Sequence, residues 1–143
     1  MAVKQISVFL ENKTGTLAEV TGILSAVKVN IRTLVIADTA EFGVLRLVVD
    51  DYETACRILK THGFAVKIHD MVAVEVADTP GAIHEVLTFL NSSAINVEYA
   101  YAFTRFSGKG GIVFFKTENI PDTISELRKH NLPVIGGDEI YGV

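Results

Sequence analysis

The sequence predicts an α+β fold built from two similar units, each ordered strand, helix, strand, strand, helix, strand (βαββαβ). Three observations lead to this prediction. The two halves of the chain repeat one another. Within each half, short runs rich in β-branched residues alternate with stretches whose apolar residues recur at helical spacing. Hydrophobic residues make up 49% of the 143 residues, a content that excludes a disordered chain. We expect each unit to form a four-stranded antiparallel sheet with two helices on one face.

The repeat appears when the sequence is compared with itself at a shift of 66 residues, which places Gly15 on Gly81. In the later part of each half the shift becomes 68 residues, and Gly43 then meets Gly111. The two extra residues fall within residues 104–110, where we expect a longer hairpin turn. We therefore predict two domains, residues 1–70 and 71–143. Identical residues also coincide at Val8 and Val74, Glu19 and Glu85, Val20 and Val86, Leu24 and Leu90, Asn30 and Asn96, Leu59 and Leu127, and His62 and His130.

The elements of the first unit follow from the period of its apolar residues. Alternation of apolar and polar residues predicts half-buried strands, and recurrence every three or four residues predicts the buried stripe of a helix. The expected elements are a strand at 6–10, a helix with the stripe Leu17, Val20, Leu24 and Val27, a hairpin of strands at 31–37 and 44–49, a helix with the stripe Tyr52, Ala55, Cys56 and Leu59, and a strand at 64–68.

The second unit repeats this order. Pro121 suits the start of the second helix, because the N–H that proline lacks has no partner within a first helical turn. The expected elements are a strand at 72–76, a helix through Ile83, Val86 and Leu90, a hairpin, a helix at 121–129 and a strand at 132–135.

Composition excludes several classes of protein. The longest stretch without a charged residue is residues 86–97, far short of the roughly 20 apolar residues that a membrane helix needs. The net charge of −4 and the pI of about 5.5 argue against a nucleic-acid partner, which would require a basic surface. The lone Cys56 and the absence of a signal-peptide pattern lead us to expect a cytoplasmic protein.

The turn that precedes the first helix of each unit has residues suited to binding. A chain that enters a helix presents unpaired N–H groups and the positive end of the helix dipole, which favour a carboxylate. Gly15 and Gly81 would let a ligand approach the backbone closely. Asn12 or Asp78 would accept hydrogen bonds from an ammonium group. Together these groups complement an α-amino acid. The alternative is that Asn12 and Asp78 only cap their helices.

The two units resemble the ACT domain, a small-molecule-sensing module of amino-acid metabolism, over essentially the whole chain. The second turn has the Asp-x-Pro-Gly pattern of that family at Asp78, Pro80 and Gly81, whereas the first turn departs from it at Asn12 and Thr14. The resemblance implies ferredoxin-like units and a ligand held between two of them. The binding residues that it implies are Asn12, Lys13, Thr14, Gly15, Thr16, Leu17, Asn30 and Ile31 in the first copy, and Asp78, Thr79, Pro80, Gly81, Ala82, Ile83, Asn96 and Val97 in the second.

A second interpretation of Asn30 and Asn96 stays open. An asparagine between a helix and a strand is often only a cap in the left-handed conformation.

We therefore expect a regulatory protein that senses a free amino acid or a related metabolite at crevices between domains. The alternative is a ligand-free interaction subunit that regulates a separately encoded metabolic enzyme. The sequence predicts no enzymatic activity, because no nucleophile, acid–base pair or phosphate-binding loop stands out. No cofactor and no metal site are expected, since the four histidines lack metal-ligand spacing.

Self-association is also expected. The sheet face away from the helices is more apolar than a solvated face should be. We predict that packing of the two units and of two chains into a homodimer covers this face. Its apolar residues are Phe9, Val44, Val48, Ala73, Ile112 and Phe114.

Overall fold

The computed structural model describes residues 2–38, 41–104 and 110–141, which form two compact units. The N-terminal unit comprises residues 4–69 together with 138–141, and the C-terminal unit comprises residues 70–137 together with 2–3. The contacts thus group each end of the chain with the unit built mainly from the other half. The domains 1–70 and 71–143 derived from the repeat stay a prediction.

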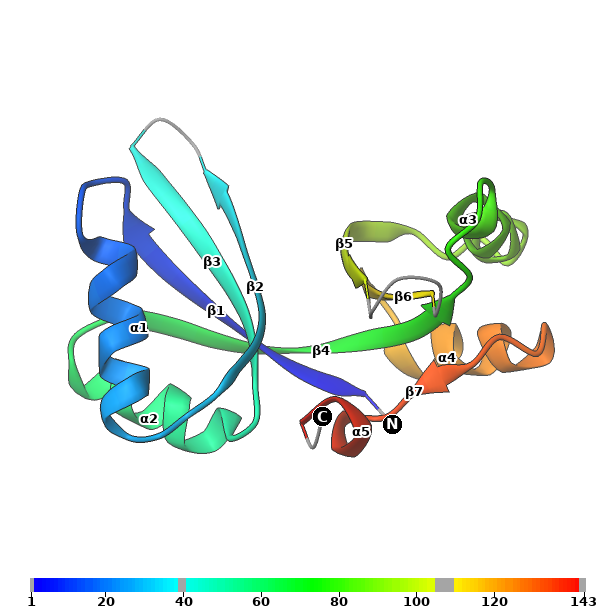
Figure 1. Cartoon of the computed structure of the whole chain (residues 1–143). Helices are drawn as coiled ribbons and strands as arrows, with labels where there is room; N and C mark the ends of the chain where they lie inside the picture. Colours follow the sequence, from blue (N-terminus) through cyan, green and yellow to red (C-terminus); the bar gives the residue numbers. More distant parts are fainter. Residues whose placement is uncertain (1, 39–40, 105–109, 142–143) are drawn as a thin grey trace. The chain divides into compact units, whose positions relative to one another are not determined.

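The N-terminal unit has the βαββαβ order that the sequence predicts (Figure 1). Its sheet has the strand order β2-β3-β1-β4, so that β2 forms one edge. Antiparallel pairing sets Val8 opposite Leu45. The elements are β1 (Val3–Glu11), α1 (Thr16–Ala26), β2 (Ile31–Asp38), β3 (Phe42–Val49), α2 (Tyr52–Thr61) and the first part of β4 (Ala65–Val76).

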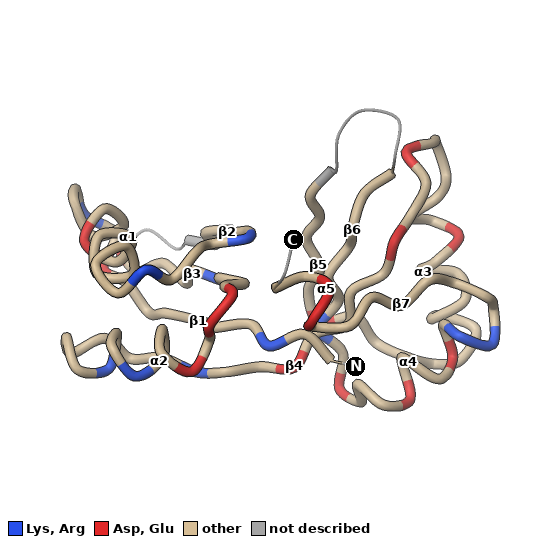
Figure 2. The backbone as a smooth tube through the Cα atoms, turned by 60° about the horizontal axis from the view of Figure 1, so that its bottom comes forward, with Lys and Arg blue, Asp and Glu red and all other residues tan. Residues whose placement is uncertain are grey.

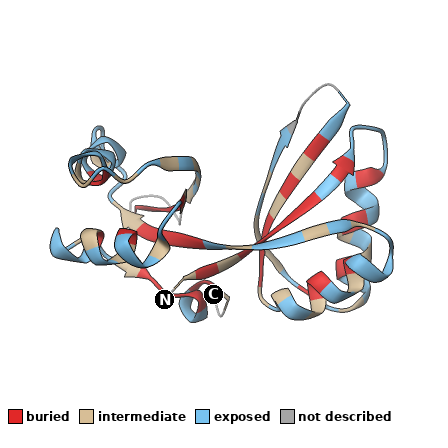
Figure 3. Cartoon of the chain, turned by 180° about the vertical axis from the view of Figure 1, so that it is seen from behind, coloured by how far each residue is buried: buried red, intermediate tan, exposed pale blue. Residues whose placement is uncertain are grey.

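The core of the N-terminal unit lies between this sheet and its two helices. Side chains of successive strand residues point to opposite faces of a sheet, and the buried residues of the strands form one core with those of α1 and α2. Figure 3 marks the buried residues along these elements in red. Burying these side chains supplies the main driving force for folding. The buried residues of the core are Ile6, Val8, Leu10, Val20, Leu24, Val29, Leu45, Leu47, Val49, Ala55 and Leu59.

The C-terminal unit repeats this plan with the strand order β5-β6-β4-β7. Its core contains Val72, Val86 and Phe115 among its buried residues. The hydroxyls of Thr117 and Thr123, both buried, lie 2.6 Å apart and join β6 to α4. The elements are the second part of β4, α3 (Ala82–Ser92), β5 (Val97–Thr104), β6 (Gly111–Thr117), α4 (Ile120–Lys129) and β7 (Val134–Ile135).

Two elements differ from the sequence prediction. The strands expected at 64–68 and 72–76 are a single strand, β4, because residues 69–71 include no glycine or proline to interrupt it. A short helix, α5 (Gly137–Tyr141), follows β7, where no element is expected. The longer hairpin turn expected within 104–110 falls mainly on residues outside the described part of the chain.

The apolar sheet face expected to drive self-association is already largely buried. Val48, Ala73, Ile112 and Phe114 are each at most 1% exposed, and Phe114 stacks on Tyr101 and Phe103 with ring centroids 5.3 and 5.7 Å apart. Phe9 remains 45% exposed, and Val44 is half-buried.

Acidic and basic residues are interspersed over both units (Figure 2), a distribution unlike the basic stripe of a nucleic-acid-binding protein.

Candidate functional site

The two helices that follow the predicted binding turns begin differently from the other two long helices. Gly15 and Gly81 are the N-caps of α1 and α3, with φ of 91° and 89°, and neither helix has a side-chain cap. By contrast, the side chains of Asp51 and Asn119 cap α2 and α4. The alternative in which Asp78 caps its helix is therefore wrong, and the N-cap position of α1 is taken by Gly15, not by Asn12.

The uncapped helices leave backbone donors available. In α3, the N–H of Ala82 donates to the Thr79 carbonyl over 3.3 Å, and the N–H of Glu85 donates to the Gly81 carbonyl over 2.9 Å. The two N–H groups that lie between these donors, on Ile83 and His84, have no hydrogen-bond acceptor among the described residues. The same holds in α1 for the N–H groups of Leu17 and Ala18. We call these four groups the turn donors.

A small cavity adjoins the turn in each unit, and we call the pair the first-turn cavities. Seven lining positions correspond under the repeat, which shows that the hollow belongs to the shared fold. The cavity in the N-terminal unit, of about 90 Å³, is lined by Leu10, Glu11, Asn12, Lys13, Thr16, Leu17, Ile36 and Gly43. The cavity in the C-terminal unit, of about 130 Å³, is lined by Val76, Ala77, Asp78, Thr79, Ile83, Ala102, Phe103, Gly111 and Val113.

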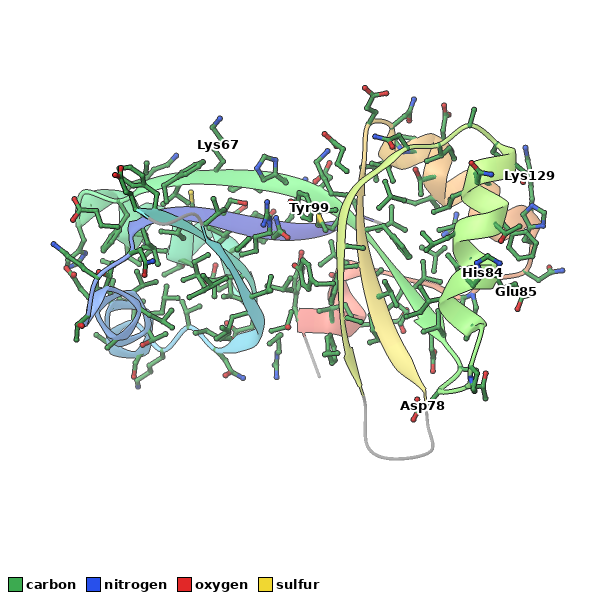
Figure 4. All side chains as sticks on the ribbon, turned by 90° about the horizontal axis from the view of Figure 1, so that it is seen from above. Lys67, Asp78, His84, Glu85, Tyr99 and Lys129 are labelled. Carbon is green, nitrogen blue, oxygen red and sulfur yellow. The ribbon has the colours of Figure 1, made fainter. Side chains whose placement is uncertain are left out.

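A larger cavity of about 740 Å³, here called the acidic cavity, adjoins the turn of the C-terminal unit. Its lining residues include Glu75, Asp78 and Glu85 and, among the described residues, no lysine, arginine or histidine. Figure 4 labels Asp78 on the turn and Glu85 in the first turn of α3. The other lining residues are Val76, Ala77, Thr79, Pro80, Gly81, Ala82, Val86, Gly110, Leu132 and Pro133.

The polar side chains of the two turns are arranged differently. The exposed carboxylate of Asp78 makes no ion pair or hydrogen bond within the described part of the chain. In the N-terminal unit the Lys13 ammonium lies 3.2 Å from the Glu11 carboxylate, so that these two charges satisfy one another. The N–H of Asn12 donates to the Glu41 carbonyl, which ties this turn to the β2–β3 hairpin. The C-terminal turn therefore offers an uncompensated negative charge, and the N-terminal turn does not.

The structure does not bring all the sequence-predicted site residues together. Asn30 and Ile31 line a separate cavity of about 400 Å³, which does not share a residue with the first-turn cavity. The N–H of Asn30 donates to the Asp50 carboxylate over 2.9 Å. The left-handed residues after α1 and α3 are Lys28 and Ala94. The interpretation of Asn30 and Asn96 as left-handed caps is therefore wrong.

The remaining predicted residues divide between the turn and its surroundings. Thr14 and Gly15 form the first turn without lining its cavity, whereas Pro80, Gly81 and Ala82 line the acidic cavity. Asn96 is exposed, and Val97 packs against the core of the C-terminal unit.

Sequence reasoning missed several lining residues. Glu85, an exposed residue of the first turn of α3, lines the acidic cavity. Ile36 and Phe103 reach the first-turn cavities from the second strand of each unit, and Leu132 and Pro133 reach the acidic cavity from the segment before β7. The repeat could have indicated these strand residues, because the shift of 66 residues places Ile36 on Ala102, the neighbour of Phe103.

A metal site and a membrane-spanning helix are both missing from the described residues. Within residues 2–38, 41–104 and 110–141, no three His, Cys, Asp or Glu side chains are grouped closely enough to hold a metal ion. Among the helices of those residues, none has the length and apolar character needed to cross a membrane.

Comparison with known proteins places the chain in a family. A family model described as an ACT domain pair matches residues 1–141. Protein BT0572 from Bacteroides thetaiotaomicron is 36% identical, with a TM-score of 0.94 over 100% of this chain and 98% of that one. The ligand-free regulatory subunit of aspartate kinase from Thermus thermophilus is 16% identical, with a TM-score of 0.65 over 88% and 91% of the two chains.

The regulatory subunit of aspartate kinase from Thermus flavus gives a similar result. It is 15% identical, with a TM-score of 0.63 over 88% of this chain and 90% of that one. No curated protein matches the sequence. Because the family model spans nearly the whole sequence, the chain belongs to the family of ACT domain pairs.

Proposed function

We propose that this protein is a non-catalytic regulatory protein that binds a free α-amino acid at the turn entering α3, and a related ligand at the turn entering α1. The observation that supports this most strongly is the pair of unbonded N–H groups that follow a glycine N-cap in both units, each beside a cavity. Membership of the ACT domain pair family supports the same function.

The chemistry of the C-terminal turn complements both ends of an amino acid. The N–H groups of Ile83 and His84 would hold the carboxylate, aided by the positive end of the α3 dipole. The free carboxylate of Asp78 would accept hydrogen bonds from the ammonium group. Gly81 leaves the approach open, because no atom lies within 4 Å of the position that a Cβ would take.

The N-terminal turn favours a different ligand or weaker binding. Its donors on Leu17 and Ala18 match those of the C-terminal turn, so a carboxylate remains acceptable. The position of Asp78 is taken by Asn12, and the nearby Glu11 carboxylate is already paired with Lys13. An ammonium group would therefore gain less here.

A second copy of the chain is the proposed cover for these shallow sites. Leu17, Leu34 and Ile36 are exposed by 36%, 44% and 41%, and they lie on α1 and on the edge strand β2 beside the first-turn cavity. An edge strand with exposed apolar side chains is a template for pairing with another strand. We therefore place the interface of the proposed homodimer at this edge instead of the sheet face expected from the sequence.

Regulation of a separate enzyme is the second candidate function. Two of the structures with this fold are regulatory subunits of aspartate kinase, which is a statement about those proteins. The departures at Asn12 and Thr14 favour a version that binds its enzyme without an amino acid. A stoichiometric enzyme retained on purification without added amino acid would favour this candidate.

Calorimetric titration with each of the twenty amino acids tests the first proposal. We expect at least one to bind with a Kd of about 1 mM or tighter, corresponding to about 4.1 kcal/mol. Asp78→Asn should then weaken binding about tenfold, because it removes a charged acceptor for the ammonium group. Asp122→Asn, which changes an exposed carboxylate on α4, should leave the affinity unchanged. Absence of binding by all twenty amino acids at millimolar concentration would contradict the proposal.

A further inference from the structure

The two first-turn cavities occupy equivalent places in the repeat but differ in size. The cavity of the C-terminal unit has a volume of about 130 Å³, whereas that of the N-terminal unit has about 90 Å³. Each cavity is lined only by residues of its own unit. Four pairs of equivalent residues give the two cavities their apolar walls. They are Leu10 and Val76, Leu17 and Ile83, Ile36 and Ala102, and Gly43 and Gly111.

One of these pairs, Ile36 and Ala102, differs most in side-chain volume. Ile36 lies on the edge strand β2 and pairs with Leu45 of the N-terminal core. Ala102 lies on the edge strand β5 and pairs with Val113 of the C-terminal core. Directly paired strand residues project from the same face of a sheet, so both side chains lie on the face that bears the helices. Because the Ile36 Cγ2 atom is also 3.6 Å from the place that a Cβ on Gly43 would take, Ile36 narrows its cavity, whereas Ala102 leaves the equivalent space open.

The wider C-terminal cavity combines polar turn residues with apolar walls. Asp78 and Thr79 belong to the turn, and the other described residues that line this cavity have no polar side chain. Ile83, which bears one of the turn donors, lines it as well. In the function proposed above, these turn residues hold the carboxylate and ammonium groups of an amino acid, and the side chain on the same carbon atom enters the apolar hollow. The lining therefore favours a ligand with an apolar side chain.

The volume of each cavity limits the side chain that fits. An apolar protein cavity of about 150 Å³ is large enough for benzene. At about 130 Å³ the C-terminal cavity is smaller, so it suits a branched aliphatic group and excludes the benzyl group of phenylalanine and the indole group of tryptophan. The N-terminal cavity, at about 90 Å³, suits a smaller group.

We propose that the first-turn cavity of the C-terminal unit is a pocket for a branched aliphatic group, and that Ala102 is the residue that determines its size. In the proposed function, on which this inference rests, the group is the side chain of valine, leucine or isoleucine. Ile36, at the equivalent position, restricts the N-terminal unit to a smaller side chain, such as that of alanine. The two units therefore recognise different amino acids at the same place in the fold.

Amide spectra of the ¹⁵N-labelled full chain test the selectivity of each unit separately. Shifts at Ile83 and His84 report binding in the C-terminal unit, and shifts at Leu17 and Ala18 report binding in the N-terminal unit. Leucine should bind the C-terminal unit at least about tenfold more tightly than alanine, because a missing methylene in an apolar pocket already costs about tenfold or more. Phenylalanine should bind it more weakly than leucine. Equal affinities for leucine and alanine, or tighter binding of phenylalanine, would overturn the proposal.

Substitutions at the two equivalent positions test the role of Ala102. Ala102→Ile should weaken leucine binding in the C-terminal unit at least about tenfold and leave alanine binding unchanged, whereas Ile36→Ala should strengthen leucine binding in the N-terminal unit. Ala100→Ile is the matched control, because Ala100 is also exposed on β5 and does not line the cavity. It should leave both affinities unchanged. Equal effects of Ala102→Ile and Ala100→Ile on leucine binding would overturn the role of Ala102.

A probe without the amino-acid head group separates the pocket from the function on which it rests. Isobutanol has a branched aliphatic group and should cause saturable shifts of the Ile83 and Val113 methyl signals in wild type, but not in Ala102→Ile. If amino acids bind without a preference for aliphatic side chains, the pocket is overturned and the proposed function stands. If no amino acid binds, the proposed function fails and isobutanol decides: shifts that Ala102→Ile removes support the pocket, and their absence in wild type overturns it.

Discussion

Gly15 and Gly81 adopt a backbone conformation that other residues rarely take. Their φ angles of 91° and 89° place the chain in the left-handed region, and the space around each is open. A substitution by alanine therefore meets backbone strain without a steric clash. The glycines serve the entry of the chain into α1 and α3, and they keep the turn donors accessible.

Gly81→Ala should destabilise the protein by about 1–2 kcal/mol, the cost of a left-handed alanine. Gly22→Ala is the matched control, because Gly22 lies exposed inside α1 with no atom near its added Cβ. That change should stabilise the protein by about 0.4–1 kcal/mol. Urea denaturation of both variants measures the difference. A stabilising Gly81→Ala would show that the turn does not require glycine.

The four long helices differ in how their first turns are satisfied. The Asp51 carboxylate accepts hydrogen bonds from both the backbone N–H and the hydroxyl of Thr54, over 3.0 and 2.6 Å. The Asn119 side chain caps α4 by accepting a hydrogen bond from the Asp122 N–H over 3.0 Å. The helices α1 and α3 lack such caps. The capped helices are thus stabilised locally, whereas the uncapped ones keep donors for another partner.

Asp51→Ala should cost about 1 kcal/mol of stability, the typical value of a lost N-cap. Hydrogen bonds from Thr54 hold the pKa of Asp51 below its usual 3.8. The contribution of this carboxylate is therefore present above pH 3.8 and is lost as the pH falls below that value. Unfolding of wild type and variant at pH 7 and at progressively lower pH should show the difference shrinking. A difference that stays constant with pH would contradict this role of the charged cap.

At the scale of helices and strands, the spacing of apolar residues predicted most elements correctly but not all of them. Val20 and Leu24 are buried as their spacing predicts, but Leu17 is 36% exposed because it lies beside the sheet edge at β2. The lack of a glycine or proline at residues 69–71 was the local signal for one long strand, and the period of the apolar residues alone did not show it. The helix α5 is too short for a periodic pattern, and its Tyr141 is hydrogen-bonded to Lys4 and Arg32, which are distant in sequence.

At the scale of the whole molecule, the repeat explains why the same features occur twice. It predicted the glycine turns and the order of elements in both units. It could not predict the acidic cavity, because that cavity also depends on Leu132 and Pro133, which lie far along the chain from Asp78. It also could not predict that Asn30 and the first turn line separate cavities.

The proposed dimer leads to a prediction about the β2 edge. Light scattering at micromolar concentration should give the mass of two chains, and Leu34→Lys should shift the protein to a monomer by placing a charge on the apolar edge. Ile68→Lys is the matched control, since Ile68 is 42% exposed on β4, against 44% for Leu34. A monomeric wild type, or equal effects of the two substitutions, would contradict the proposed interface.

The central claim is that the turn donors of α3 hold the carboxylate of an amino acid. The most direct measurement is the amide spectrum of ¹⁵N-labelled protein during titration with each of the twenty amino acids. We predict that at least one produces saturable shifts at Ile83 and His84, larger than those at the capped Thr54 and Asp122. Binding of a carboxylate at these donors would be contradicted if none of the twenty amino acids shifted the Ile83 and His84 signals at millimolar concentration, or if the shifts centred on other residues.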